Sequence, residues 1–192
     1  MDVGRGDARE MPQNLVVKED GSEGQEKERL RRSYHPAHVR ILFVGESPPA
    51  SGRFFYQADS GLYRAIRNTF RAALPALPED DFLHSFQNLG CYLVDLCGKP
   101  VDDLTPGKRK QACRDGEVRL ARTLKELQPE IVITGLRSIS ANVKRTQANA
   151  NWKGLFVELP YPGRWKEHRL AFEGALKPIL RKELAHVEWR KK

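Results

Sequence analysis

Four short apolar segments constrain the fold of this chain more than any other feature of its sequence. They are VRILFV (39–44), YLVDL (92–96), EIVIT (130–134) and GLFVEL (154–159). Each is rich in Val, Ile, Leu or Phe and nearly continuous rather than alternating, which is typical of strands covered on both faces. The segments therefore predict the strands of a parallel sheet.

Helical patterns separate these segments. Ser60 is placed to cap one helix, and Thr105 followed by Pro106 opens a longer one. A third helix follows Gly135, and the last spans about residues 167–184. Because strands and helices alternate, we predict a three-layer α/β/α sandwich with a central, mainly parallel four-stranded sheet.

The length and composition indicate one domain. The chain has 192 residues, of which 40% are hydrophobic, enough for a sizeable core. Residues 1–33 are polar and charged and are expected to form a flexible arm, so the domain spans residues 34–192. No apolar run is long enough for a membrane span and no signal peptide is recognisable, so we expect a cytoplasmic protein without membrane contact.

The chemistry-bearing cysteines and histidines do not form a metal motif. Cys91, Cys97 and Cys113 include no CxxC pair, so we expect buried free thiols. His35 and His38 have a metal-like spacing but lack partner ligands in the sequence. We therefore expect no bound metal.

The charge balance favours a polyanionic partner. Lys and Arg number 33 against 25 Asp and Glu, a formal net charge of +8. The alternative is that many of these cations cover solvated helix faces, which is the role expected of Arg114, Arg119 and Arg122.

Parallel sheets bind ligands beyond the carboxyl ends of their strands. The loops at these ends are GESPPASGRFF, CGKPVDDLTPGKRK, GLRS and PYPGRWKEHR, all polar or basic. Neither GxGxxG nor a P-loop sequence is present, which disfavours an enzyme of free nucleotides.

These loops resemble those of the uracil-DNA glycosylase superfamily, most closely families 4 and 5, over residues 39–185. The first loop contains Gly-Glu-Ser-Pro-Pro (45–49) and then Arg-Phe-Phe (53–55), where the relatives have Gly-Glu-Ala-Pro-Gly and Pro-Phe. The stretch that starts LCGKP matches the second block in order and length, and Leu-Pro-Tyr-Pro (159–162) stands where the relatives have His-Pro-Ser. The resemblance implies cleavage of an N-glycosidic bond in DNA.

The resemblance also assigns roles to residues. Glu46 would be the catalytic carboxylate that orients water and balances the sugar cation, and Phe55 or Phe54 would stack on the extruded base. The expected base pocket comprises Gly45, Ser47, Pro48, Pro49, Phe54, Phe55, Asp95 and Gly135. The expected DNA contacts are Arg53, Lys99, Lys108, Arg109, Arg137, Tyr161, Arg164, Trp165 and Lys166.

Several roles have structural alternatives. Glu46 is otherwise a capping or salt-bridged acid, and one of Phe54 and Phe55 must pack inward. Asp95 is otherwise a strand-end cap, and Tyr161 with Trp165 otherwise covers the sheet edge.

Departures from the family narrow the expected substrate. Cys97 and Cys113 resemble only the second pair of iron–sulfur ligands, so no cluster is expected. Leu159 replaces the family's histidine, and the asparagine that reads uracil falls near Leu93. Pro49 stands where a tyrosine excludes C5 substituents, so the pocket is open there.

These features predict a monomeric glycosylase for a modified base, such as the hydroxymethylated or glucosylated cytosine of phage DNA, with a role in phage defence as a hypothesis. The alternative is a DNA-binding relative without catalytic activity.

Overall fold

The computed structural model describes residues 20–185, which form a four-stranded sheet between two layers of helices. The strands are β1 Ile41–Gly45, β2 Cys91–Asp95, β3 Ile131–Thr134 and β4 Leu155–Glu158. All pairs are parallel and the spatial order is β2-β1-β3-β4. The predicted α/β/α sandwich is confirmed, and each predicted strand is present within two residues of its expected bounds.

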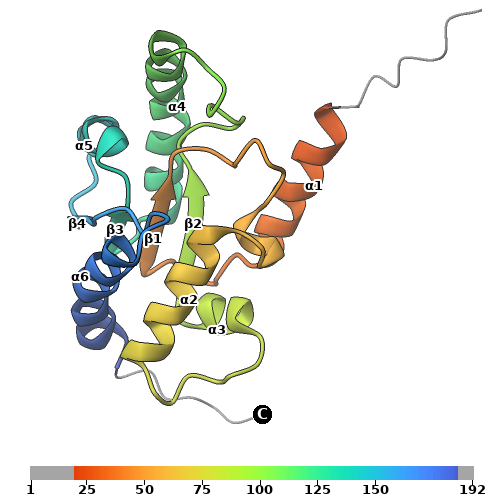
Figure 1. The fold of residues 1–192 in the computed structure, drawn as a ribbon. Coiled ribbons are helices and arrows are strands. Elements are labelled where there is room, and N and C mark those ends of the chain that lie inside the picture. The colour runs from red at the N-terminus through yellow and green to blue at the C-terminus, as the bar shows by residue number, and fades with distance from the viewer. Residues whose placement is uncertain (1–19, 186–192) are drawn as a thin grey trace, which may run out of the picture.

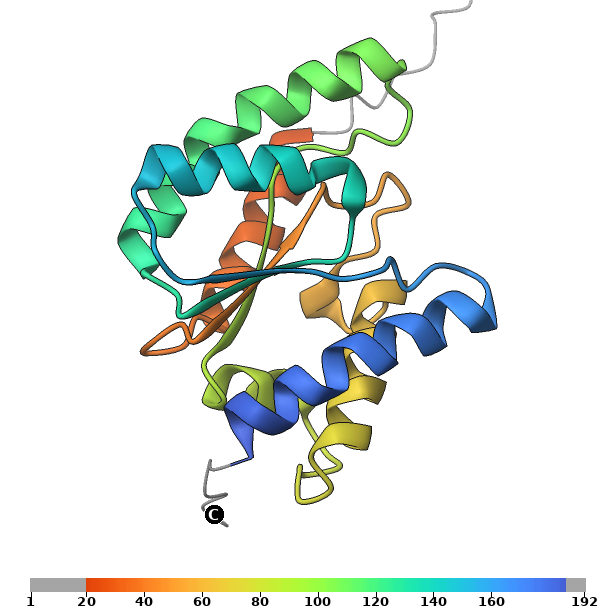
Figure 2. The ribbon, with the colours of Figure 1, turned by 90° about the vertical axis from the view of Figure 1, so that its left-hand side faces the viewer.

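The helices cover the two faces of the sheet unequally. The helical elements are α1 Asp20–Ser33, the short 3₁₀ helix η1 Phe55–Gln57, α2 Gly61–Ala73, α3 Phe82–Asn88, α4 Pro106–Leu127, α5 Arg137–Ala150 and α6 Lys166–Leu184. Figure 2 shows α4 and α5 on one face and α2, α3 and α6 on the other. No helix within residues 20–185 is long and apolar enough to cross a membrane.

The predicted helix starts follow from local chemistry. The Ser60 hydroxyl accepts a hydrogen bond from the Tyr63 amide at 3.1 Å and so caps α2. Pro106 occupies the first turn of α4, as predicted, but the Thr105 side chain makes no capping hydrogen bond. Among the helices, α3 was not predicted, because its seven residues are too few for a clear periodic pattern.

The expectation of a flexible arm over residues 1–33 is wrong for residues 20–33, which form α1. Ion pairs between successive turns hold this helix: Lys27 with Glu23 at 2.7 Å and Arg32 with Glu28 at 2.9 Å. At its carboxyl end, Tyr34 stacks on Tyr56 with ring centroids 5.6 Å apart. Residues 1–19 of the expected arm lie outside the described residues.

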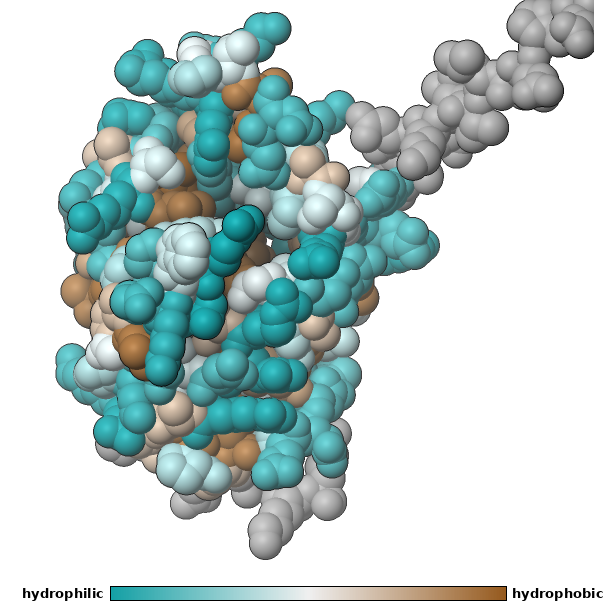
Figure 3. All heavy atoms as spheres, viewed as in Figure 1, coloured by the Kyte–Doolittle hydropathy of each residue, from teal (hydrophilic) through white to brown (hydrophobic). Residues whose placement is uncertain are grey.

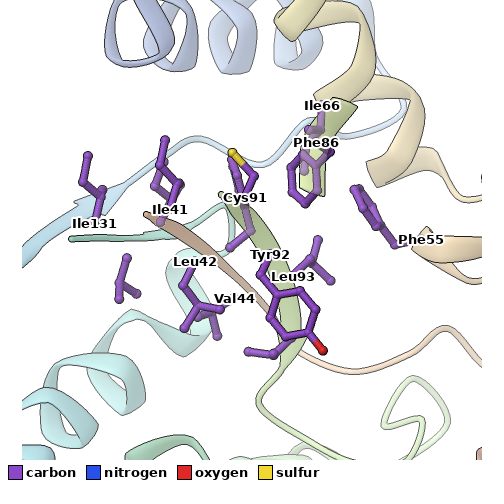
Figure 4. Close-up of a cluster of buried hydrophobic side chains, with 14 of the residues drawn as sticks. Ile41, Leu42, Val44, Phe55, Ile66, Phe86, Cys91, Tyr92, Leu93 and Ile131 are labelled. Carbon is purple, nitrogen blue, oxygen red and sulfur yellow. The ribbon is translucent and has the colours of Figure 1, made fainter. Parts of the chain in front are cut away.

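The core lies mainly on the α2, α3 and α6 side of the sheet. Figure 4 shows Phe55, Ile66 and Phe86 packed beside the sheet residues Ile41 and Cys91. In contrast, β4 is an edge strand with only partial cover, and Leu155 is 51% exposed. The expectation that all four strands are covered on both faces is therefore wrong for β4, whose residues are half-buried or exposed, whereas the other edge strand, β2, is almost fully buried.

Candidate functional site

The loops that follow β1 and β2 lie beside α1 at one end of the sheet (Figure 1). Between α1 and these loops lies a groove of about 940 Å³. One wall is formed by residues of α1 between Glu23 and Arg32, other than Glu26 and Leu30. The other comprises the loop residues Pro48, Pro49, Ala50 and Gly52 and residues 98–100 after β2, with Arg119 from α4. The groove thus occupies the position where an open parallel sheet binds ligands.

A smaller cavity of about 70 Å³ opens from this groove toward the sheet. Pro48, Phe54, Asp95 and Cys97 line it, together with groove residues that include Arg31 and Arg119. The cavity that Phe54 and Asp95 line therefore adjoins the groove.

Asp95 is the last residue of β2 and faces Gly45, its partner at the end of β1. A Cβ atom on Gly45 would lie 2.5 Å from Asp95 Oδ1, so only glycine leaves room for this carboxyl group. Burial raises the pKa of Asp95 from 3.8 to about 6, against an opposing effect of Arg31 and Arg119. Asp95 is thus a carboxyl group of perturbed acidity inside a cavity, a combination typical of functional sites.

Two guanidinium groups converge on the same cavity. Arg119 Nη2 donates to the backbone oxygens of Asp95 at 2.6 Å and Leu96 at 3.0 Å. Burial, and then the charge of Arg31, lower the pKa of Arg119. Arg119 is an exposed residue of α4, as expected of a solvated helix face, but its guanidinium group also contacts the end of β2.

Glu46 follows β1 and is only 8% exposed. Arg109 of α4 binds both carboxylate oxygens, with Nε 2.8 Å from Oε1 and Nη2 in contact with Oε2. The Cys113 thiol lies 3.7 Å from Oε1. Glu46 therefore forms a bidentate ion pair with Arg109 and is not among the residues that line the groove or the cavity.

This ion pair changes the expected role of Arg109. The sequence placed Arg109 among the DNA contacts, whereas its guanidinium group holds Glu46 in place and the ion pair raises the pKa of Arg109. The catalytic role of Glu46 stays a prediction.

The three cysteines are buried free thiols, as expected. Cys97 and Cys113 lie with their sulfur atoms 3.7 Å apart, and burial raises the pKa of Cys97 to about 12. His38 contacts Glu130 at 3.3 Å, and His35 packs on the Tyr92 ring. Within residues 20–185, no three His, Cys, Asp or Glu side chains are grouped so as to hold a metal ion.

The structure distinguishes the two phenylalanines. Phe55 packs against Phe86, with centroids 5.3 Å apart, and against Tyr63 at 5.7 Å, inside the core (Figure 4). Phe54 lines the cavity, and its amide donates to Asp59 Oδ1 at 2.8 Å. Phe54 is therefore the candidate for stacking, whereas Phe55 lies in the core, and the stacking role stays a prediction.

The remaining candidates lie in two separate groups. Pro48, Pro49 and Lys99 line the groove. The groove and cavity are lined neither by the loop residues Ser47, Arg53 and Lys108 nor by the residues after β3 and β4, namely Gly135, Arg137, Tyr161, Arg164, Trp165 and Lys166. The residues after β3 and β4 lie apart from the groove because β3 and β4 are on the far side of β1 from β2.

Tyr161 and Trp165 are 56% and 64% exposed, so most of each side chain faces solvent. Leu159 is only 2% exposed, and its amide donates a hydrogen bond to the Thr134 backbone oxygen at 2.8 Å. Leu159 is therefore a packing residue.

Sequence reasoning missed the residues of α1 that form one wall of the groove. Their signal was the spacing of Glu23 with Lys27 and of Glu28 with Arg32, since such pairs stabilise isolated helices. No protein-family model matches the chain, and no curated protein matches it.

Proposed function

We propose that this chain is a DNA glycosylase that removes a modified base, of the cytosine type, from DNA and leaves an abasic site. The observation that carries the proposal is the cavity beyond β1 and β2, which contains an aromatic ring, Phe54, and a carboxyl group, Asp95, beside two arginines. A base extruded from DNA needs an aromatic or apolar face and polar groups for its edge. Phe54 and Asp95 supply these two elements.

The carboxyl group favours a base with an exocyclic amino group. An ionised carboxylate only accepts hydrogen bonds, so Asp95 suits the amino group of cytosine and opposes the carbonyl oxygens of uracil. Pro49, Ala50 and Gly52 in the adjoining groove are small residues that leave room for a substituent at C5. Both features support a C5-substituted cytosine as the substrate.

The reaction needs charge stabilisation at two places. The sugar develops positive charge, which Glu46 is proposed to balance while it orients the attacking water. The Arg109 guanidinium fixes this carboxylate through two hydrogen bonds. The departing base develops negative charge, and Arg31 and Arg119, which line the cavity, are proposed to stabilise it in place of the histidine of the uracil-DNA glycosylase superfamily.

Base release tests the proposal. The protein is incubated with oligonucleotides that contain uracil, thymine, hypoxanthine, 5-hydroxymethylcytosine or its glucosylated form, and alkali then cleaves abasic sites. We expect strand breaks at a modified cytosine with the wild type. The Glu46→Gln variant should lose at least about a hundredfold in rate while its DNA affinity stays within twofold.

Glu79→Gln is the matched control, because Glu79 is exposed and remote from the groove. Thermal melting of both variants separates loss of chemistry from loss of fold. Release of uracil in preference to modified cytosines would refute the proposed substrate class.

A second candidate is a DNA-binding protein without catalysis. This candidate is favoured by the ion pair between Glu46 and Arg109, because the paired Glu46 carboxylate does not line the cavity. Tight, salt-sensitive DNA binding with no base release from any oligonucleotide would establish this second function.

A further inference from the structure

Apart from Arg31, the α1 wall of the groove has no role in the proposed chemistry. Residues of α1 from Glu23 to Arg32 face the loops after β1 and β2 across a space of about 940 Å³. The cavity that contains Phe54 and Asp95 opens from this space and shares α1 residues with it. Any ligand that reaches the cavity through the groove must therefore pass along α1.

The lining of the groove is strongly cationic. It includes two acids, Glu23 and Glu28, against the cations Lys27, Arg29, Arg31, Arg32, Lys99 and Arg119. Six cations and two acids give these lining residues a formal excess of four positive charges. This excess is complementary to a chain of phosphates.

Two of the cations, Arg31 and Arg119, have unfavourable surroundings that a bound anion would stabilise. Arg31 Nε is buried and has no acceptor among residues 20–185. Arg119 lies close enough to Arg31 for the like charge to lower its pKa. An anion between the two guanidinium groups would offset their repulsion and supply an acceptor for the unpaired donor.

We propose that the groove between α1 and the strand-end loops binds a single strand of DNA, with its phosphates along α1 and one base directed toward Phe54. The choice of DNA as the polyanion rests on the function proposed above. The groove is concave and walled on both sides, which suits one strand; a duplex presents its phosphates on a convex surface. The combination of a cationic groove with an aromatic ring is typical of proteins that bind single strands.

Direct binding measurements with unmodified DNA test this proposal. Fluorescence anisotropy compares a labelled 12-nucleotide oligothymidylate with a duplex of the same length over a series of salt concentrations. We expect the single strand to bind more tightly. Lys27→Ala and Arg29→Ala should each weaken its binding about fivefold at 0.1 M salt and lower the slope of log K against log salt by about 0.7.

Lys153→Ala is the control, because Lys153 is exposed at the opposite end of the sheet, just before β4. Arg29 is exposed, so its variant should keep the fold, which circular dichroism would verify. Equal or tighter binding of the duplex, unchanged slopes in both variants, or effective competition by thymidine monophosphate would overturn the proposal.

The measurement is independent of the reaction. Preferential single-strand binding without base release from any substrate would leave this inference intact and refute the glycosylase. Base release with unaltered binding in the α1 variants would do the reverse.

Discussion

Two carboxyl groups at neighbouring strand ends differ in their surroundings. Glu46 after β1 has a guanidinium partner on both oxygens, whereas Asp95 at the end of β2 has no comparable ion pair with any residue from 20 to 185. Burial therefore raises the pKa of Asp95 to about 6. The first group is fixed in place by its partner, and the second is available to a ligand in the cavity.

The acidity of Asp95 predicts a pH-dependent loss of stability. Because burial raises its pKa from 3.8 in the unfolded chain to about 6, the folded state binds the proton more tightly. This contribution to stability is fully present below about pH 4 and is lost as the pH rises through about 6. Relative to Asp95→Asn, the wild type should lose up to about 3 kcal/mol between pH 4 and pH 7.

Urea unfolding of both proteins at pH 4, 5, 6, 7 and 8 measures this difference. A stability difference that does not change with pH would contradict the raised pKa.

Among the helices, α4 carries the groups that organise the site, and its close approach to the sheet depends on a glycine. A Cβ atom on Gly116 would lie 2.2 Å from the Leu96 backbone oxygen, whereas one on Gly107 of the same helix would meet nothing within 4 Å. This contact places Arg119, Cys113 and Arg109 at the ends of β1 and β2.

Gly116→Ala should therefore destabilise the fold by about 1–3 kcal/mol, since a backbone oxygen cannot move aside cheaply. Gly107→Ala is the matched control and should be neutral or slightly stabilising, because alanine has the higher helix propensity. The denaturant midpoints of the two variants measure this difference in stability. Equal midpoints would show that α4 adjusts without cost.

The attachment of α1 depends on few side chains near its carboxyl end. Tyr34 stacks on Tyr56, and Gln87 Nε2 donates to the backbone oxygens of Ser33 at 3.3 Å and His35 at 2.9 Å. The amino-terminal part of the helix instead borders the groove. The helix is thus anchored at one end.

Tyr34→Ala should release this anchor. We expect amide exchange in α1 to become at least tenfold faster, while β1 keeps its protection because its residues are buried in the sheet. Hydrogen–deuterium exchange with mass spectrometry gives both rates in one experiment. Simultaneous loss of protection in β1 would mean that α1 is part of the cooperative core.

On the scale of the whole molecule, charge and surface chemistry govern association. Figure 3 shows a face that is largely hydrophilic, with apolar side chains in scattered groups. The chain carries a formal net charge of +8. Two copies repel each other at low salt, and a polyanion attracts both.

We therefore predict a monomer in solution without DNA. Sedimentation equilibrium at 0.05 M salt should give the mass of one chain, although β4 offers an exposed strand edge. A dimer that persists after dilution would show that this edge, or another surface, binds a second copy.

The strands were predictable because a strand buried in a parallel sheet needs a continuous run of apolar residues, and such a run can be recognised from neighbouring residues alone. The start of α2 was predictable for the same reason, since Ser60 caps within three residues. In contrast, α1 is held by Tyr56 and Gln87, which are distant in sequence, so a local reading assigned it to an arm.

The sequence by itself determined the α/β/α sandwich and pointed to the loops after β1 and β2 that line the groove, because strand periodicity, helix caps and the ends of parallel strands are local properties. Only the tertiary structure decided which residues of those loops share a cavity. It joined Glu46 to Arg109 across 63 positions, selected Phe54 over Phe55 and directed Arg119 to the end of β2. These outcomes depend on how α1 and α4 pack against the sheet edge, and packing between distant segments leaves no local pattern in a sequence.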